Sequence, residues 1–252
     1  MGPGAVSAAQ RLVYPVLGLL VIAAVWEGAI VVFGIPTFVL PSLPAIAKAI
    51  AADLPALLAG LRVTLYEAAV GYVLGGAVAI ALALAFVLAP LLERAAMPII
   101  VAVNSVPVVA YAPVALVALG MGSASKIAMV ALAAGFAVFV NAMNGLKAID
   151  PAAVNLMRSF GAGALRTVWI LRLPAALPAI VSGLRVAIVR SIIIAIVAEM
   201  LGAYAGLGQM IYLATQQVDF LRVWAAIVVA SVASMTLYGL FAWVDRRLVW
   251  WK

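Results

Sequence analysis

The sequence contains neither cysteine nor histidine. These residues supply the thiolate and imidazole ligands of most transition-metal sites, and histidine is also the usual proton carrier near neutral pH. Without cysteine the chain also has no disulfide and no thiol nucleophile. The two absences argue against a metal-dependent or redox enzyme, so we expect no metal site and no catalytic residue.

Charge is scarce as well. Only 9% of the 252 residues are charged, whereas 69% are hydrophobic, and the mean hydropathy is +1.30. A soluble domain is about a quarter charged, so this composition cannot cover a water-exposed surface, and the lipid bilayer is the expected solvent. The net charge of +7 comes from scattered basic residues without interleaved aromatics. Nucleic acid is therefore not an expected partner.

Six apolar runs are long enough to cross the hydrocarbon core, which takes about 20 helical residues. They are apolar on every face, whereas barrel strands would alternate over about 10 residues. We therefore predict an all-α membrane protein with one transmembrane domain over residues 1–252. The predicted spans cover about residues 13–33, 61–88, 95–119, 126–143, 177–201 and 223–244. The first run is too long for a secretory signal and lacks a small-residue cleavage site, so we expect it to be retained.

Basic residues are distributed unevenly between the two sets of loops. The termini, the second-to-third connection and the fourth-to-fifth connection hold nine of them, and the outer loops hold four, namely Lys48, Arg62, Lys126 and Arg222. Because Lys and Arg are enriched in cytoplasmic loops, both termini are predicted to be cytoplasmic. The nine residues are Arg11, Arg94, Lys147, Arg158, Arg166, Arg172, Arg246, Arg247 and Lys252.

The connection between the fourth and fifth spans, about residues 145–176, is the least apolar part of the chain. Asp150 before Pro151 is typical of a helix start, because Asp caps free N–H groups and Pro is tolerated in the first turn. Gly161-Ala162-Gly163 predicts a bend, and Pro174 predicts the end of a second short helix. The segment of about residues 150–173 is either a loop on the membrane surface or a docking element for a soluble partner. Its exposed cations would be Arg158, Arg166 and Arg172.

Two stretches of this segment resemble a known motif. They are Asn155-Leu156-Met157-Arg158-Ser159-Phe160-Gly161-Ala162 and Leu171-Arg172-Leu173-Pro174, and together they are similar to the EAA loop of ABC importer permeases. The resemblance extends over nearly the whole chain and is closest to permeases of the nitrate, sulfonate and taurine type. Residues 157–162 look more like the pyrimidine and riboflavin-type members. Supporting segments are Trp26-Glu27, Leu40-Pro41-Ser42, Gly120-Met121-Gly122, Gly183-Leu184-Arg185 and Gly206-Leu207-Gly208.

The resemblance implies partners and a coupling site. In this family two permease copies form the pore, two ATPase subunits dock on the loop, and a periplasmic or lipid-anchored binding protein delivers the solute. The implied coupling residues are Asp150, Asn155, Arg158, Ser159, Phe160, Gly161, Ala162, Arg166 and Pro174. Asn155-Leu156-Met157 replaces the usual Glu-Ala-Ala, so the acidic contact to the ATPase is absent and docking must rely on other residues.

No nucleotide-binding loop is present. The stretch most similar to one, Gly120 to Ile127, has Ser125 where the second glycine should be and Ile127 in place of Ser or Thr. The cradle of backbone N–H groups and the hydroxyl that binds Mg²⁺ are both missing. We therefore expect no cofactor on this chain, with ATP and Mg²⁺ bound by partner subunits.

Five ionisable residues fall inside the predicted spans, where each costs roughly 2.5–3.5 kcal/mol unless it has a partner or water. They are Glu27, Glu67, Arg185, Arg190 and Glu199. The three glutamates lie towards span ends, where either water reaches them or an interhelical pair or snorkelling of the side chain satisfies them. Arg190, near mid-span, either contacts an anionic or carbonyl-rich solute or pairs with Glu67 or Glu199.

The third span contains two residues that interrupt helices. Pro107 and Pro113 each remove a backbone hydrogen bond, and broken helices in membranes usually line cavities. The predicted translocation pathway is lined by Asn104, Pro107, Tyr111, Pro113, Arg190 and Glu199, although a packing kink would explain the prolines as well. The spacing of Gly71 and Gly75 predicts close helix packing, within one subunit or between two.

Two other function classes fit a helical membrane protein less well. An ion-coupled carrier or channel needs a titratable relay, but histidine is absent and the few intramembrane acids lie near the outer side. An intramembrane enzyme needs paired acids or a nucleophile with its base, and no span brings two acids within two turns. We therefore predict a permease subunit, not an enzyme, of an ABC importer in the bacterial cytoplasmic membrane. Its cargo would be a small polar solute. The solute would resemble either nitrate, sulfonate and taurine or the pyrimidine and riboflavin-type compounds.

Overall fold

The computed structural model describes residues 8–248, and within that range the chain is helical with no strand. The prediction of an all-α fold is confirmed. Lys252 and the side chains of Arg11, Arg246 and Arg247 lie outside the described part. The elements are α1 (Ala8–Phe33), α2 (Leu43–Ala52), α3 (Leu54–Leu88), α4 (Pro90–Ser105), η1 (Val108–Tyr111), α5 (Ala112–Leu119), α6 (Ser123–Lys147), α7 (Pro151–Ser159), α8 (Ala164–Thr167), η2 (Val168–Arg172), α9 (Leu173–Gly202), α10 (Leu207–Gln216) and α11 (Phe220–Leu248).

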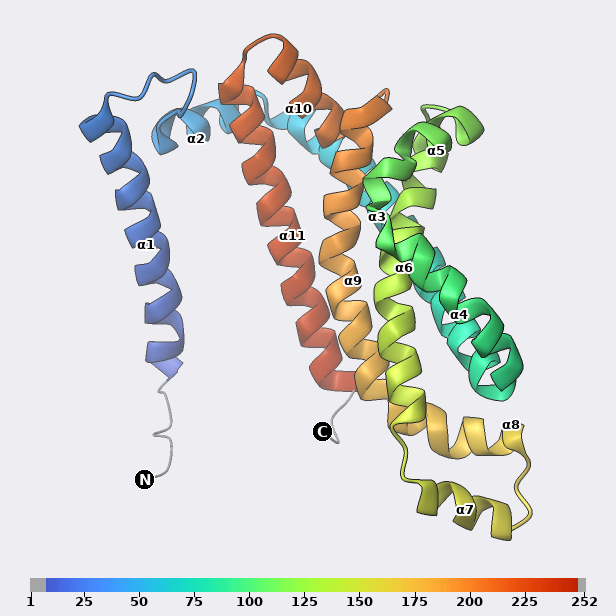
Figure 1. Cartoon of the computed structure of the whole chain (residues 1–252). Coiled ribbons are helices and arrows are strands. Elements are labelled where there is room, and N and C mark those ends of the chain that lie inside the picture. The colour runs from blue at the N-terminus through green and yellow to red at the C-terminus, as the bar shows by residue number, and fades with distance from the viewer. Residues whose placement is uncertain (1–7, 249–252) are drawn as a thin grey trace.

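The long helices run between two ends of the molecule (Figure 1). The short helices α2, α5 and α10 lie at one end, and α7 and α8 project from the other. We call these the α10 end and the α7 end. The described chain starts and finishes on the side of the α7 end, as expected for an even number of crossings.

Within residues 8–248, five helices are long and apolar enough to cross a membrane, and a bent pair of helices would make a sixth crossing. The prediction of six spans therefore holds if the bent pair counts as one. The third predicted span, residues 95–119, is this pair, in which Pro90–Ser105 and Val108–Leu119 meet at 91°. The second span begins earlier than predicted, because α3 runs unbroken for 35 residues from Leu54.

The core lies where α3, α6 and α9 pack together, and it is built mainly from alanine with a few large side chains. Phe86 of α3 and Phe139 of α6 meet edge to face, with ring centroids 5.7 Å apart. Small residues bring the helix backbones close. A Cβ atom on Gly71 would lie 2.6 Å from Val130, and one on Gly75 would lie 2.3 Å from the carbonyl oxygen of Ala131. The glycine pair therefore packs within one subunit, which decides between the two possibilities that its spacing left open.

Replacing Gly75 with valine is expected to prevent correct packing of α3 on α6, because the new side chain would have to displace backbone rather than a flexible side chain. Folded, monodisperse protein recovered in detergent measures the effect, and most of it should be lost. Gly28→Val in α1 is the matched control, because a Cβ there meets nothing within 4 Å. Equal yields of the two variants would contradict this packing.

The helix α1 stands apart from the other spans in Figure 1 and is joined to them near its C-terminal end. Trp26 donates from Nε1 to the carbonyl oxygen of Pro41 at 3.0 Å, and its ring contacts the edge of Trp224 in α11. Glu27 accepts a hydrogen bond from the backbone N–H of Leu43 at 2.6 Å. This intramembrane glutamate therefore has a structural partner, since it caps the first turn of α2.

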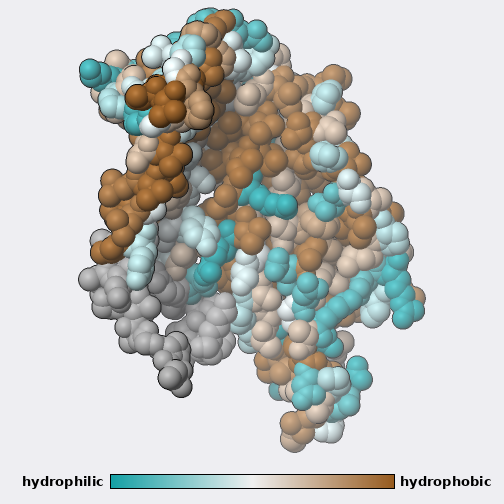
Figure 2. Space-filling view, turned by 60° about the vertical axis from the view of Figure 1, so that its left-hand side comes forward, coloured by the Kyte–Doolittle hydropathy of each residue, from teal (hydrophilic) through white to brown (hydrophobic). Residues whose placement is uncertain are grey.

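Apolar side chains cover large parts of the face seen in Figure 2, and hydrophilic ones are seen both at the top of the view and in its lower half. The most exposed apolar residues include Val31 and Phe33 of α1 and Val117 of α5. Such a surface is unfavourable in water but is suited to lipid or to a second membrane-spanning subunit.

Candidate functional site

The bend between α4 and η1 is caused by Pro107. Because proline has no N–H, it cannot donate the helical hydrogen bond to the carbonyl oxygen of Val103, four residues earlier. The hydroxyl of Tyr111 fills the gap, donating to that oxygen at 3.0 Å. Tyr111 was predicted to line the pathway, and the structure shows that it stabilises the broken helix.

Pro113 does not break a helix. It lies in the first turn of α5, where the missing N–H removes no hydrogen bond. The expectation that it frees a carbonyl inside a span is therefore wrong. Only one of the two prolines causes the bend, and the difference is their position relative to the start of α5.

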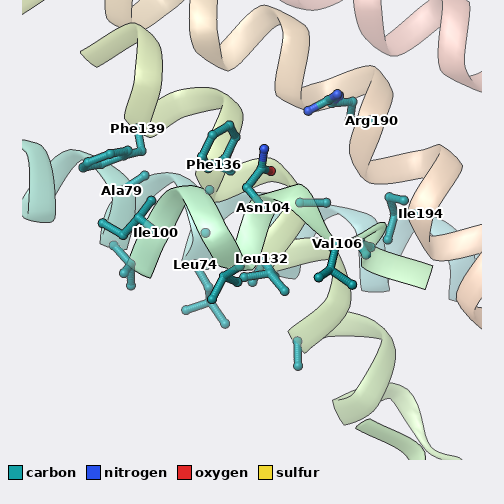
Figure 3. A pocket seen from close by; sticks show the side chains of 18 of the residues that line it. Leu74, Ala79, Ile100, Asn104, Val106, Leu132, Phe136, Phe139, Arg190 and Ile194 are labelled. Carbon is teal, nitrogen blue, oxygen red and sulfur yellow. The ribbon is translucent and has the colours of Figure 1, made fainter. Parts of the chain in front are cut away.

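A cavity of about 800 Å³ lies between α3, α4, α6 and α9, next to this bend. Figure 3 shows it from close by, with apolar side chains such as Ile100, Leu132 and Phe136 around it. Two hydrogen-bonding side chains line the same cavity, Asn104 from α4 and Arg190 from α9. Of the residues predicted for the pathway, Asn104, Pro107 and Arg190 line the cavity, and Tyr111, Pro113 and Glu199 do not.

Arg190 is exposed and extends from α9 towards Phe136 and Asn104 (Figure 3). Neither Glu67 nor Glu199 pairs with it, because the ion pairs in the described residues are Lys147 with Glu93, Arg185 with Asp245, and Arg222 with Asp53. A guanidinium group without a carboxylate beside an apolar wall can bind an anionic or carbonyl oxygen of a ligand. The predicted structural pair of Arg190 with Glu67 or Glu199 is therefore not formed.

Glu199 lies outside the cavity and is 1% exposed. Its carboxyl group accepts hydrogen bonds from the hydroxyl of Thr64 at 3.0 Å and from the backbone N–H of Gly208 at 2.7 Å. Glu67 is 2% exposed. Of the two possibilities left open for these glutamates, water access is ruled out, because the start of α10 folds back over the end of α9. The interhelical alternative holds for Glu199, whose partner Thr64 lies in α3.

Lys126 was placed in an outer loop by the sequence, but it is 1% exposed. Its ammonium group donates to the carbonyl oxygens of Met121 at 2.7 Å, Gly122 at 3.3 Å and Gly202. The sequence offered no signal for this burial, since a lysine at the start of a span normally reaches water. A buried charge cluster was thus missed.

Arg185 and Asp245 form an ion pair that joins α9 to α11, and the side chain of Asp245 is nearly buried. The sequence placed Arg185 inside the fifth span but did not identify its partner. Asp245 lies 60 residues away in a different helix, so the pair depends on the packing of α9 against α11.

At the α7 end, α7 and α8 form the helix pair predicted for residues 150–173 (Figure 1). The carboxylate of Asp150 accepts a hydrogen bond from the N–H of Ala152 at 2.8 Å, which confirms the predicted helix start. Gly161 makes the bend with a φ of +76°, a conformation that favours glycine. Between the two helices Phe160 is 79% exposed. An unpartnered aromatic ring at a protruding tip is typical of a docking surface.

The other residues of this surface are mostly exposed as well. Asn155, Arg158, Ser159 and Arg166 are exposed, as are the apolar side chains of Leu156 and Leu165, whereas Ala162 is buried. Together with Phe160 and Gly161 these exposed residues define what we call the tip surface. It carries two arginines and no carboxylate.

Two expectations for this segment are wrong. Arg172 does not belong to the tip surface, because its guanidinium donates to the carbonyl oxygen of Leu146 at 3.0 Å and so holds η2 against the end of α6. Pro174 does not end a helix, because the chain stays helical from Ala164 to Gly202. Val168–Arg172 forms a π-helical turn just before this proline, and such wide turns accommodate a missing N–H.

Residues 71–250 match the family described as "Binding-protein-dependent transport system inner membrane component". The chain is 31% identical to a probable ABC transporter permease protein of Haemophilus influenzae, over 95% of this chain and 98% of that protein. It is 29% identical to the formylaminopyrimidine transport permease protein ThiX of Halalkalibacterium halodurans, over 94% and 95% of the two chains. Among solved structures, an inward-facing form of the MetNI methionine ABC transporter is similar in fold, with a TM-score of 0.63 at 21% identity, covering 79% of this chain and 96% of that chain.

Proposed function

The chain belongs to the family of binding-protein-dependent transport system inner membrane components, and from this premise we propose that its central cavity lies on a translocation pathway. A member of this family is a membrane-spanning permease subunit of an ABC importer and not an enzyme. Hydrolysis of ATP belongs to separate ATPase subunits, and partners that bind ATP and deliver solute follow from the family. The sites, the assembly and the cargo are our proposals.

The observation that carries the pathway is Arg190. It is a charged residue at the middle of a span, it lines the cavity next to Asn104, and it has no carboxylate partner among the described residues. A cation left unpaired inside a membrane is costly, so a functional partner is the simplest reason for its presence. We assign Arg190 and Asn104 as the groups that contact the solute during passage.

The cargo proposed from this chemistry is a small polar solute with anionic or carbonyl oxygens. Arginine donates to such oxygens, and the amide of Asn104 can both donate and accept. The name of the relative in Halalkalibacterium halodurans, a formylaminopyrimidine permease, fits a solute of this kind. Sulfonate-like anions fit the same two groups.

The tip surface is proposed to contact the ATPase subunits. Its support is the exposure of Phe160 and of the apolar side chains beside it, at a helix pair that projects from the bundle. Asn155 stands in place of an acidic residue, so this chain cannot offer a carboxylate for a salt bridge at that position. The contact would depend instead on apolar burial and on Arg158 and Arg166. The α7 end would then be cytoplasmic, together with both termini, in a bacterial inner membrane.

A second copy of the chain is proposed to complete the pore. In the single chain α4 has no fully buried residue, although it carries Asn104 and forms one wall of the cavity. A helix exposed in this way is suited to packing against another membrane helix. Two copies, two ATPase subunits and one binding protein at the α10 end would form the importer.

In the proposed mechanism, ATP binding draws the ATPase subunits together, and the tip surface transmits this motion to α6 and α9. The bend at Pro107 allows α4 to move relative to α5, so the cavity opens alternately towards the two ends. Arg190 offers a transient partner for the solute as it passes. Hydrolysis of ATP then resets the arrangement.

Affinity purification of the tagged chain in mild detergent, followed by reconstitution in liposomes, tests the proposal. We expect an ATP-binding subunit to co-purify and uptake to require ATP and a binding protein. If the chain purifies alone and moves solute without ATP, the importer assembly is wrong and an ion-coupled carrier takes its place. The neighbouring binding protein can then be screened to identify the solute.

A further inference from the structure

Three ionisable side chains meet near the α10 end of the bundle, outside the cavity, and all three are almost fully buried. Glu67 comes from α3, Lys126 from the first turn of α6 and Glu199 from the last turn of α9, and they are 2%, 1% and 1% exposed. We call them the buried triad. No step of the proposed transport mechanism uses them.

The charge of Lys126 is fixed by its hydrogen bonds. Its nitrogen lies beside three backbone carbonyl oxygens, which belong to Met121, Gly122 and Gly202. Three acceptors require the three N–H donors of an ammonium group, so this side chain is protonated. The ammonium also satisfies the C-terminal turn of α9, where Gly202 lies.

The two carboxyl groups are short of hydrogen-bond donors. Glu199 receives the hydroxyl of Thr64 and the N–H of Gly208, both on Oε2, and its Oε1 has no partner. Glu67 contacts the hydroxyl of Ser123, and its Oε2 also has no partner. Lys126 has already used its donors on the carbonyls. The side chains of the two glutamates contact each other directly.

Two ionised carboxylates in contact would repel each other and leave both free oxygens unpaired. A single proton on one of them would act as a donor to the other and would satisfy both. It would also balance charge, because the ammonium of Lys126 would then face one remaining negative carboxylate. A buried group of charges is tolerable only when it is paired in this way.

We propose that Glu67 and Glu199 bind one proton between them, so that with Lys126 they form an electrically neutral cluster within the membrane. This proton-binding site fixes the turn between α9 and α10. The hydroxyl of Thr64, which donates to Glu199, also accepts the N–H of Leu207 at 2.9 Å. The inference rests on these contacts alone and does not depend on the proposed function.

The backbone of the turn between α9 and α10 packs closely against Glu199. Gly206 has a φ of +118°, and a Cβ atom there would lie 2.2 Å from the carboxyl carbon of Glu199. A Cβ atom on Gly208 would lie 2.0 Å from the carbonyl oxygen of Ile196. Both glycines are thus required for the close approach of the backbone to the carboxyl group. Glu199 closes the α10 end by holding this turn.

The first test is infrared spectroscopy of the full chain, with any subunits that co-purify, in lipid nanodiscs. A protonated carboxyl group gives a carbonyl stretching band that shifts in D₂O, and carboxylates do not. We expect the band in the wild type and its loss in both Glu67→Gln and Glu199→Gln. Glu93→Gln is the control, because Glu93 is paired with the exposed Lys147. A wild type without the band, or a band that survives in both triad variants, would overturn the proposal.

The second test uses thermal unfolding of the same variants to determine how many of the two glutamates are ionised. A single glutamine replaces the protonated acid without changing the net charge, and its amide can donate to the remaining carboxylate. Each single variant should therefore have the same melting temperature as the wild type. The double variant leaves the buried ammonium uncompensated, and its melting temperature should fall by roughly 6–12 °C.

The pattern distinguishes the alternatives. If both carboxylates were ionised, each single substitution would raise the melting temperature above that of the wild type. If both were protonated, the double variant would match the wild type. If a sodium ion took the place of the proton, the band would be absent and stability would rise with sodium concentration. Each of these results overturns the proposal. Absence of the band in the wild type overturns the proposal even if a variant fails to fold.

Discussion

Gly161→Val is expected to abolish the ATPase activity of the assembled importer that depends on the permease, while the permease itself remains folded. Gly161 has a φ of +76°, a region in which a β-branched residue is strongly disfavoured. The side chain would force the bend between α7 and α8 to open and would displace Phe160 from the tip. A docking contact weakened by about 1.4 kcal/mol loses about tenfold in affinity, and a misplaced tip should lose more.

The chain offers a matched control two residues away. Gly163 has a φ of −70°, and a Cβ atom there meets nothing within 4 Å. Gly163→Val should therefore leave the tip in place and most of the stimulated ATPase activity intact. Co-purification of the ATPase subunit and its activity in liposomes are the two measurements. If the two valine variants behave alike, the tip surface does not depend on the bend at Gly161 and the coupling proposal fails.

Arg190→Ala is expected to lower ATP-dependent uptake far more than basal ATPase activity. Removal of a charged hydrogen bond to the solute costs roughly 1.5–3 kcal/mol, which corresponds to about 10- to 160-fold in rate. The reason for the selective effect is that Arg190 lines the cavity and has no structural partner among the described residues. Uptake of labelled solute and ATP hydrolysis are measured in the same liposomes.

Two further variants separate contact with solute from a structural role. Arg190→Lys keeps the charge but not the planar guanidinium, so it should restore part of the uptake. Arg62→Ala, at an exposed arginine of α3 outside the cavity, should change neither activity. Equal losses of uptake and ATPase activity in Arg190→Ala, or a loss of folded protein, would show that Arg190 stabilises the bundle instead.

Much of the candidate site was predictable, because its signals are local in the sequence. Asp150 before Pro151 is a helix start that needs only the chemistry of one turn, and its side chain caps α7 as expected. Gly161 lies between two short helical patterns, and its positive φ follows from its being the residue type that tolerates such a bend. Arg190 was identified by the cost of a charge in an apolar span, and Pro107 by the missing N–H.

The errors share a different cause. For Glu199 and Glu67 water access was left open, and Lys126 was assigned to a loop, because each lies near the end of its own span. Their burial arises from three helices and the turn at Gly206–Gly208, which lie far apart in the sequence. Arg172 was expected among the exposed cations of residues 150–173. Helical spacing alone does not show that its guanidinium reaches the carbonyl oxygen of Leu146.

Composition and local pattern alone determined that this chain is a helical membrane protein with about six crossings. They also identified a two-helix segment between the fourth and fifth spans and a resemblance to importer permeases. The crossings were predictable because a hydrocarbon solvent requires every backbone group to be satisfied within its own helix. Only the tertiary structure decided which charges are paired, that Gly71 and Gly75 pack inside one subunit, and that Arg190 faces a cavity. Those outcomes depend on distances of a few ångströms between helices, and no single segment carries that information.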